Sequence, residues 1–138
     1  MKLTSGKLRY LLTIASLGRN SQKVRCIDVA VQLGVSRASV CKMLSSLCKE
    51  GILYQHSDKS LHITTEGQIL AEEYAARYRQ IYPAFEQMGL SEFDSQECAM
   101  ALLSQLPEQT LKNVCAAFAS QSSTHDCCQS FYPSLTSA

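Results

Sequence analysis

Apolar residues recur at helical spacing along most of the chain, and short polar stretches separate the periodic segments. Residues 4–17, 27–33 and 37–49 each place apolar side chains three and four positions apart, the pattern of a helix buried on one side. Thr4 or Ser5 is expected to cap the first helix, and Gly18 to end it. The first third of the chain therefore predicts three short helices.

A three-residue turn, Gly34-Val35-Ser36, joins the second and third predicted helices. Glycine permits a sharp reversal, and a serine hydroxyl caps the helix that follows. The outer face of that later helix is polar and basic, with Ser36, Ser39, Lys42, Ser46 and Lys49. On the second helix of a helix-turn-helix, such a face suits the major groove of DNA.

Two short strands are predicted next, at 52–55 and 61–64, around the polar turn 56–60. A hairpin after a helix-turn-helix makes a winged helix, whose tip can contact the DNA backbone. The sequence therefore predicts major-groove contacts from some side chains and phosphate contacts from others. The former are Ser36, Ala38, Ser39 and Lys42; the latter are Arg37 on the helix and Lys59 and Ser60 on the wing.

The second half of the chain has the pattern of three more helices. A long amphipathic helix is expected from Thr65, with Gln68 completing its cap and Pro83 as a point of bending. Shorter helices follow, one opened by Asp94 and one over 108–120. Because these helices have too few residues to enclose a core, they predict a twofold dimer. The expected organisation is mainly α: a winged-helix DNA-binding domain at 1–67, a helical dimerisation domain at 68–120 and a flexible tail at 121–138.

Charge divides the chain in the same way. The 138 residues carry a net charge of +1, but residues 1–64 sum to +7 and residues 65–138 to −6. A basic first half suits a polyanion such as double-stranded DNA. The sequence has no run of 18 apolar residues, and its start lacks the apolar core of a signal peptide. We therefore expect a cytoplasmic protein that does not enter membranes.

Several of these segments together resemble the family of iron- and manganese-dependent repressors. The resemblance covers about residues 5–120 and rests on Tyr10-Leu11, residues 27–30, 33–40, 51–53 and 57–67, and Gly89-Leu90 before the next helix. It implies a winged-helix domain, a helical dimerisation domain and a dimeric repressor that binds palindromic operators. The short chain implies that the SH3-like third domain of some members is absent.

The family's Fe(II) or Mn(II) ligands do not carry over to this sequence. The corresponding positions are Arg9, Leu12, Tyr78, Met100, Leu103 and Ser104. Of these side chains, only the Met100 thioether could ligate a metal, and a thioether alone holds these ions poorly. An arginine at a ligand position would also repel a cation. We therefore expect no metal cofactor at this site.

Three other ways of sensing an effector remain open, each beside a plainer interpretation. His125, Cys127 and Cys128 could bind metal or form a spacer. Cys26 and Cys41 could be redox-reactive thiols, with pKa values lowered by Arg25 and Lys42, or inert like Cys48, which is expected in the core. An apolar pocket could take a small organic ligand, or its lining could be core; that lining is Tyr74, Tyr78, Tyr82, Met100 and Leu103.

Two other classes of function are alternatives to DNA binding. A winged helix can also be a protein–protein interaction module, with its basic face on an acidic partner. An enzyme is not expected, because His56, His62 and His125 lie apart in the sequence. No Ser/Cys–His–acid set and no phosphate-binding loop can be identified.

Overall fold

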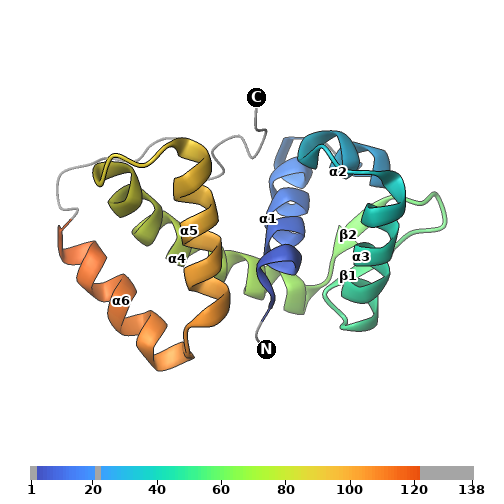
Figure 1. Ribbon diagram of the computed structural model, residues 1–138. Helices are drawn as coiled ribbons and strands as arrows, with labels where there is room; N and C mark the ends of the chain where they lie inside the picture. The colour runs from blue at the N-terminus through green and yellow to red at the C-terminus, as the bar shows by residue number, and fades with distance from the viewer. Residues whose placement is uncertain (1–2, 21–22, 122–138) are drawn as a thin grey trace. The chain divides into compact units, whose positions relative to one another are not determined.

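The computed structural model describes residues 3–20 and 23–121. As the sequence predicts, the fold is mainly helical, with a helix-turn-helix followed by a β-hairpin (Figure 1). The elements in chain order are α1 (Ser5–Asn20), α2 (Cys26–Leu33), α3 (Arg37–Lys49), β1 (Leu53–Gln55), β2 (Leu61–Ile63), α4 (Thr65–Gln87), α5 (Glu92–Gln105) and α6 (Glu108–Gln121). None of the described helices combines the length and apolar content that crossing a membrane requires.

The described residues form two compact units. Residues 9–20 and 23–72 make up the winged unit, and residues 3–8 and 73–121 make up the helical unit. The division cuts α1 near its start and α4 after its second turn, so each of these helices contributes residues to both units.

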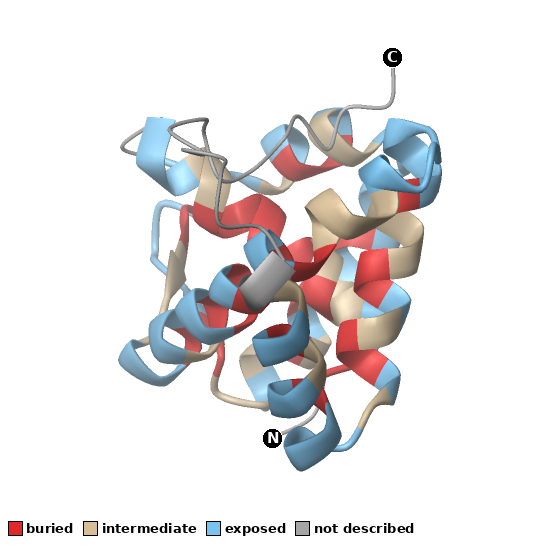
Figure 2. Ribbon diagram, turned by 90° about the vertical axis from the view of Figure 1, so that its left-hand side faces the viewer, coloured by how far each residue is buried: buried red, intermediate tan, exposed pale blue. Residues whose placement is uncertain are grey.

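The winged unit has a core of aliphatic side chains from its helices and its hairpin. Val29 on α2 and Val40 on α3 are fully buried, and buried residues recur along the helices of the molecule (Figure 2). The strands pair antiparallel, with Tyr54 opposite His62. Val24 extends the sheet, because its carbonyl accepts a hydrogen bond from the Leu61 N–H at 2.7 Å.

The first helix differs from its prediction at its carboxyl end. Thr4 caps α1, since its hydroxyl accepts a hydrogen bond from the Lys7 N–H. Gly18 does not end this helix, which continues to Asn20. Nothing lies within 4 Å of where a Gly18 Cβ would be, and the residue has no left-handed backbone. Glycine here weakens a helix without stopping it.

The junction between the hairpin and α4 depends on Thr64 and Gly67. The Thr64 hydroxyl donates to the Gly51 carbonyl at 2.6 Å and accepts from the Gly67 N–H at 3.0 Å. Thr64, not the predicted Thr65, therefore caps α4, and Gln68 bonds instead to Glu72. A Cβ on Gly67 would lie 2.2 Å from the Ile52 carbonyl oxygen, so only glycine lets α4 approach β1 this closely.

The helical unit is made from α4, α5 and α6. Pro83 lies inside α4, which continues past it to Gln87. The next helix begins earlier than predicted, because Ser91 accepts a hydrogen bond from the Asp94 N–H and caps α5. Asp94 is therefore the third residue of α5 rather than its cap.

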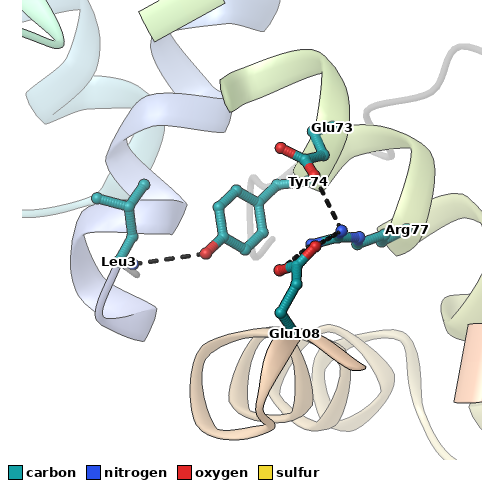
Figure 3. A network of polar contacts seen from close by, with 5 residues as sticks. All are labelled: Leu3, Glu73, Tyr74, Arg77 and Glu108. Atoms are coloured by element: carbon teal, nitrogen blue, oxygen red, sulfur yellow. Dashed lines mark hydrogen bonds and ion pairs between the residues drawn. The ribbon is translucent and has the colours of Figure 1, made fainter. Parts of the chain in front are cut away.

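A charged network crosses the helical unit (Figure 3). Arg77, only 9% exposed on α4, donates to both carboxylate oxygens of Glu108 at the start of α6 and to Glu73 one turn earlier on α4. The Tyr74 hydroxyl nearby accepts a hydrogen bond from the Leu3 N–H at 3.5 Å. These contacts fasten α6 and residue 3 to the same two turns of α4.

Candidate nucleic-acid interface

The turn of the helix-turn-helix is set by its backbone. Gly34 has a left-handed φ of 67°, and its N–H and that of Val35 both bond to the Ala30 carbonyl. This closes α2 in the manner that glycine favours. At the other end of α2, the Asp28 carboxylate accepts a hydrogen bond from the Arg25 N–H at 2.8 Å. Both ends of this short helix are therefore satisfied locally.

Two serines open α3 at the surface. The Ser36 hydroxyl accepts from the Ser39 N–H at 3.2 Å and donates to the Ser39 hydroxyl at 2.9 Å. Ser36 thus uses its one hydroxyl hydrogen inside the cap, as predicted for its capping role. The Ser39 hydroxyl is an acceptor in that bond and keeps its own hydrogen for an outside partner.

The predicted DNA-reading side chains share one exposed face of α3. Ser36, Arg37, Ala38, Ser39 and Lys42 are all exposed, as is Lys49 nearer the carboxyl end, whereas Ser46 is half-buried. Among the described residues, no ion pair engages Arg37 or Lys42. Because no carboxylate in the described part of the chain neutralises these positive charges, they remain able to attract the phosphates of a DNA backbone.

The tip of the wing is a tight turn. The Lys59 N–H bonds to the His56 carbonyl, and the His56 N–H bonds to the Ser60 carbonyl, each at 2.9 Å. Lys59 has a left-handed φ of 67°, which this three-residue loop requires of its last residue. Its side chain is exposed at the tip. Lys59 is therefore accessible at the tip of the wing, and its phosphate contact stays a prediction.

Ser60 is placed differently from its predicted role. It is 2% exposed, and its hydroxyl donates to Asp58 at 2.5 Å and lies 3.0 Å from His62 Nε2. These hydrogen bonds from Ser60, together with Lys23 at 3.2 Å, hold the pKa of Asp58 far below its usual range. Ser60 therefore holds the turn together, and the expected phosphate contact is not available to it.

Two histidines that lie apart in the sequence meet on the wing. The rings of His56 and His62 are 4.5 Å apart between centroids, and Tyr54 stacks on His62 at 5.2 Å. The strand register explains this cluster, because Tyr54 pairs with His62 and lies two residues before His56. The serine, histidine and acid are linked in the order Asp58–Ser60–His62, so the acid contacts the serine and does not orient the histidine as a catalytic triad requires.

Comparisons with known proteins find transcriptional regulators of similar sequence and a manganese regulator of similar fold. No protein-family model matches the chain. In sequence, it is similar to the transcriptional regulator MntR of Escherichia coli, with 29% identity over 102 residues, or 74% of this chain and 66% of that protein. MntR of Salmonella typhimurium is 28% identical over 74% of this chain and 65% of its own length. In structure, the manganese regulator SloR matches 87% of this chain and 55% of its own, with 21% identity and a TM-score of 0.71.

The chain is similar in sequence to regulators named MntR and in fold to the manganese regulator SloR. The resemblance inferred from the sequence motifs is thereby confirmed, and the relatives are named as transcriptional regulators, not as enzymes. The chain spans 66% of the E. coli relative and 55% of SloR, so the relationship concerns part of each.

Five of the six positions that the resemblance assigns to the family's metal ligands are buried in this chain. Leu12 is 2% exposed in the winged unit. In the helical unit, Tyr78, Met100, Leu103 and Ser104 are buried, and the Ser104 hydroxyl donates to the Ala101 carbonyl. Arg9 is half-buried. Nowhere in residues 3–20 and 23–121 do three His, Cys, Asp or Glu side chains gather to hold a metal. Apart from the Met100 thioether, the side chains at these six positions are not types that ligate Mn(II) or Fe(II).

The other predicted effector sites have different outcomes. Tyr74, Tyr78, Met100 and Leu103 are buried, and Tyr78 stacks on Tyr82, so this aromatic set belongs to the core. Cys48 is half-buried rather than fully in the core. Burial and the neighbouring Cys41 raise the pKa of Cys26, contrary to the expected lowering by Arg25 and Lys42. His125, Cys127 and Cys128 lie outside the described residues.

Proposed function

We propose that this chain is a DNA-binding transcriptional regulator, a dimeric repressor that recognises a palindromic operator. The observation that carries the proposal is the exposed face of α3, where Ser39 and Lys42 stand beside Arg37 without an acidic partner among the described residues. In this proposal α3 enters the major groove, with Ser36, Ala38, Ser39 and Lys42 toward the bases and Arg37 at a phosphate. Lys59 follows the backbone from the wing.

The salt dependence of DNA binding tests this proposal. Each lysine that neutralises a phosphate adds about 0.9 to the slope of log affinity against log salt concentration. Lys59→Gln is expected to reduce the slope by about one unit for each bound copy, with equal loss on all duplexes. Lys42→Ala is expected to lower affinity most for a duplex from upstream of the protein's own gene.

Lys112→Ala is the matched control, because Lys112 is an exposed lysine on α6 in the helical unit. It is expected to leave affinity and slope unchanged. If Lys42→Ala and Lys59→Gln behave like this control, the assignment of α3 and the wing is wrong. A chain that binds no duplex at all would favour the protein–protein module.

Dimerisation through the helical unit, residues 68–120 in the predicted division, is part of the same proposal. Met88, Leu90 and Phe93 are exposed around the turn between α4 and α5, with Met88 at 69% and Phe93 at 56%. A cluster of exposed apolar side chains is typical of an interaction surface. Light scattering of the full chain should give the mass of a dimer, and Phe93→Ser should shift it toward the monomer.

We also propose that DNA binding does not require Mn(II) or Fe(II) at the family's site. The core side chains at these positions support it. Added Mn(II) is expected to leave both the melting temperature and the DNA affinity unchanged. A rise in melting temperature that grows with Mn(II) concentration would contradict this part of the proposal alone.

A further inference from the structure

Two cysteines from different helices meet in the winged unit. Cys26 is the first residue of α2, and Cys41 lies in the second turn of α3. Cys26 is half-buried and Cys41 is exposed, and both thiols are free. Cys26 and Cys41 line the same groove, and the charge and hydrogen bond of Cys41 help to raise the pKa of Cys26.

The two thiols open onto a groove of about 700 Å³ that is also lined by Leu44, Leu53 and Tyr54. A third cysteine, Cys48, lines the same groove. It follows Cys41 by seven residues on α3, about 10 Å along the helix axis. A disulfide requires Cα atoms within about 7 Å of each other, so Cys48 cannot pair with Cys41. Cys26, which lines the same groove from α2, is the candidate partner for Cys41.

We propose that Cys26 and Cys41 form a reversible disulfide between α2 and α3 when the protein meets a small-molecule disulfide such as oxidised glutathione. In the first step the Cys41 thiolate attacks one sulfur of glutathione disulfide, whose S–S bond breaks. One glutathione leaves and takes up a proton. In the second step the Cys26 thiolate attacks the Cys41 sulfur and expels the other glutathione. Two protein thiols are oxidised, and one glutathione disulfide is reduced to two thiols.

Exposure sets the order of these steps. Cys41 is exposed on the groove, whereas Cys26 is half-buried. Burial raises the pKa of Cys26, and so do the charge and hydrogen bond of Cys41. Once Cys41 carries glutathione, the contribution of its thiol to that pKa is gone, which favours attack by Cys26. Cys41 is therefore the entry thiol and Cys26 the resolving thiol.

The second step, in which Cys26 attacks, changes the charge on the basic face of α3. Glutathione carries a net negative charge, and on Cys41 it would stand beside Lys42 on α3. Closing the bridge removes this adduct from the basic face. Only this consequence rests on the proposed function, because the bridge itself is a property of the two thiols.

Peptide mapping of the oxidised full-length chain tests the bridge without DNA. Trypsin cleaves after Arg25, Arg37, Lys42 and Lys49, which places Cys26, Cys41 and Cys48 in separate peptides: 26–37, 38–42 and 43–49. After treatment with oxidised glutathione and alkylation of the remaining thiols, the expected major product is peptide 26–37 joined to peptide 38–42. Dithiothreitol should release both.

Two serine variants distinguish the entry thiol, Cys41, from the resolving thiol, Cys26. Cys26→Ser is expected to leave peptide 38–42 carrying glutathione, and Cys48→Ser, the matched control on the same groove, is expected to keep the bridge. Three results for the wild-type chain would overturn the proposal. Peptides 26–37 and 38–42 could remain alkylated, both could keep glutathione, or they could be joined to other cysteines. A failure here leaves DNA binding by Lys42 and Lys59 untouched, so the two proposals fail separately.

Discussion

Polar side chains have different structural roles in the winged unit and in the helical unit. In the winged unit Ser36, Asp58 and Thr64 bond to residues at most three positions away or to an adjoining strand end, and they shape caps and turns. In the helical unit Arg77 reaches 31 residues along the chain to Glu108 and joins two helices. The caps and turns of the winged unit therefore depend largely on local hydrogen bonds, with Lys23–Asp58 and Thr64–Gly51 as longer-range contacts, whereas Arg77–Glu108 joins two helices that meet only in the folded chain.

The largest expected effect tests the backbone contact that closes the winged unit. Gly67→Ala places a Cβ 2.2 Å from the Ile52 carbonyl oxygen and 2.8 Å from an Ile63 methyl group. Because the nearest atom is backbone, α4 and β1 must move apart. We expect a loss of about 3 kcal/mol in the free energy of unfolding. Urea denaturation measures it, and a loss below about 1 kcal/mol would show that the junction yields easily.

The next effect tests the long-range network of the helical unit. Arg77→Ala removes the hydrogen bonds to Glu73 and Glu108, and we expect a loss of about 1–2 kcal/mol. This value is at the low end for hydrogen bonds to charged groups, because the side chains of Glu73 and Glu108 are 48% and 59% exposed and solvent weakens their interaction with Arg77. A double-mutant cycle with Glu108→Gln isolates the pair. Lys112→Ala, also on the surface of α6, is expected to change stability by less than about 0.5 kcal/mol.

The same contrast explains which features could be predicted from the sequence. The bounds of α3, the Gly34 turn and the Ser36 cap follow from residue types at fixed spacing, and the structure confirms them. The predicted Thr65 cap was wrong by one residue, because Thr64 reaches the Gly51 carbonyl thirteen positions back. Capping patterns do not contain such a tertiary contact.

The features missed at the candidate site have the same origin. The burial of Ser60 and the meeting of His56 with His62 depend on strand register, and the shared groove of Cys26 and Cys41 depends on how α2 packs on α3. The histidine cluster could have been predicted from the strand register. With Tyr54 opposite His62, His56 and His62 lie on the same side of the hairpin. No spacing rule predicts Arg77 with Glu108.

A smaller effect of opposite sign separates helix propensity from packing. Gly18→Ala adds a methyl group where nothing lies within 4 Å, inside a helix that continues to Asn20. We expect it to stabilise the chain by about 0.5 kcal/mol, because alanine is the better helix former. Thermal melts beside those of Gly67→Ala provide the measurement. Destabilisation by Gly18→Ala would restore the original prediction that this glycine ends the helix.

The smallest effect compares one carboxyl group in each unit. Hydrogen bonds from Ser60 lower the pKa of Asp58, and hydrogen bonds from Arg77 lower the pKa of Glu108. Since both folded pKa values lie below the unfolded values of about 4, each carboxylate stabilises the fold above that pH. This stabilisation is lost as the pH falls below about 4 toward the folded pKa.

Neutral variants distinguish the two carboxyl groups. Asp58→Asn should reduce the acid sensitivity of hydrogen exchange around the hairpin, and Glu108→Gln should reduce it at the start of α6. The two variants should each leave the other region's pH profile as in the parent, because their hydrogen-bond partners lie in different units. Equal changes in both regions for either variant would show that the two units unfold as one, and the distinction between local and long-range stabilisation would then not extend to acid unfolding.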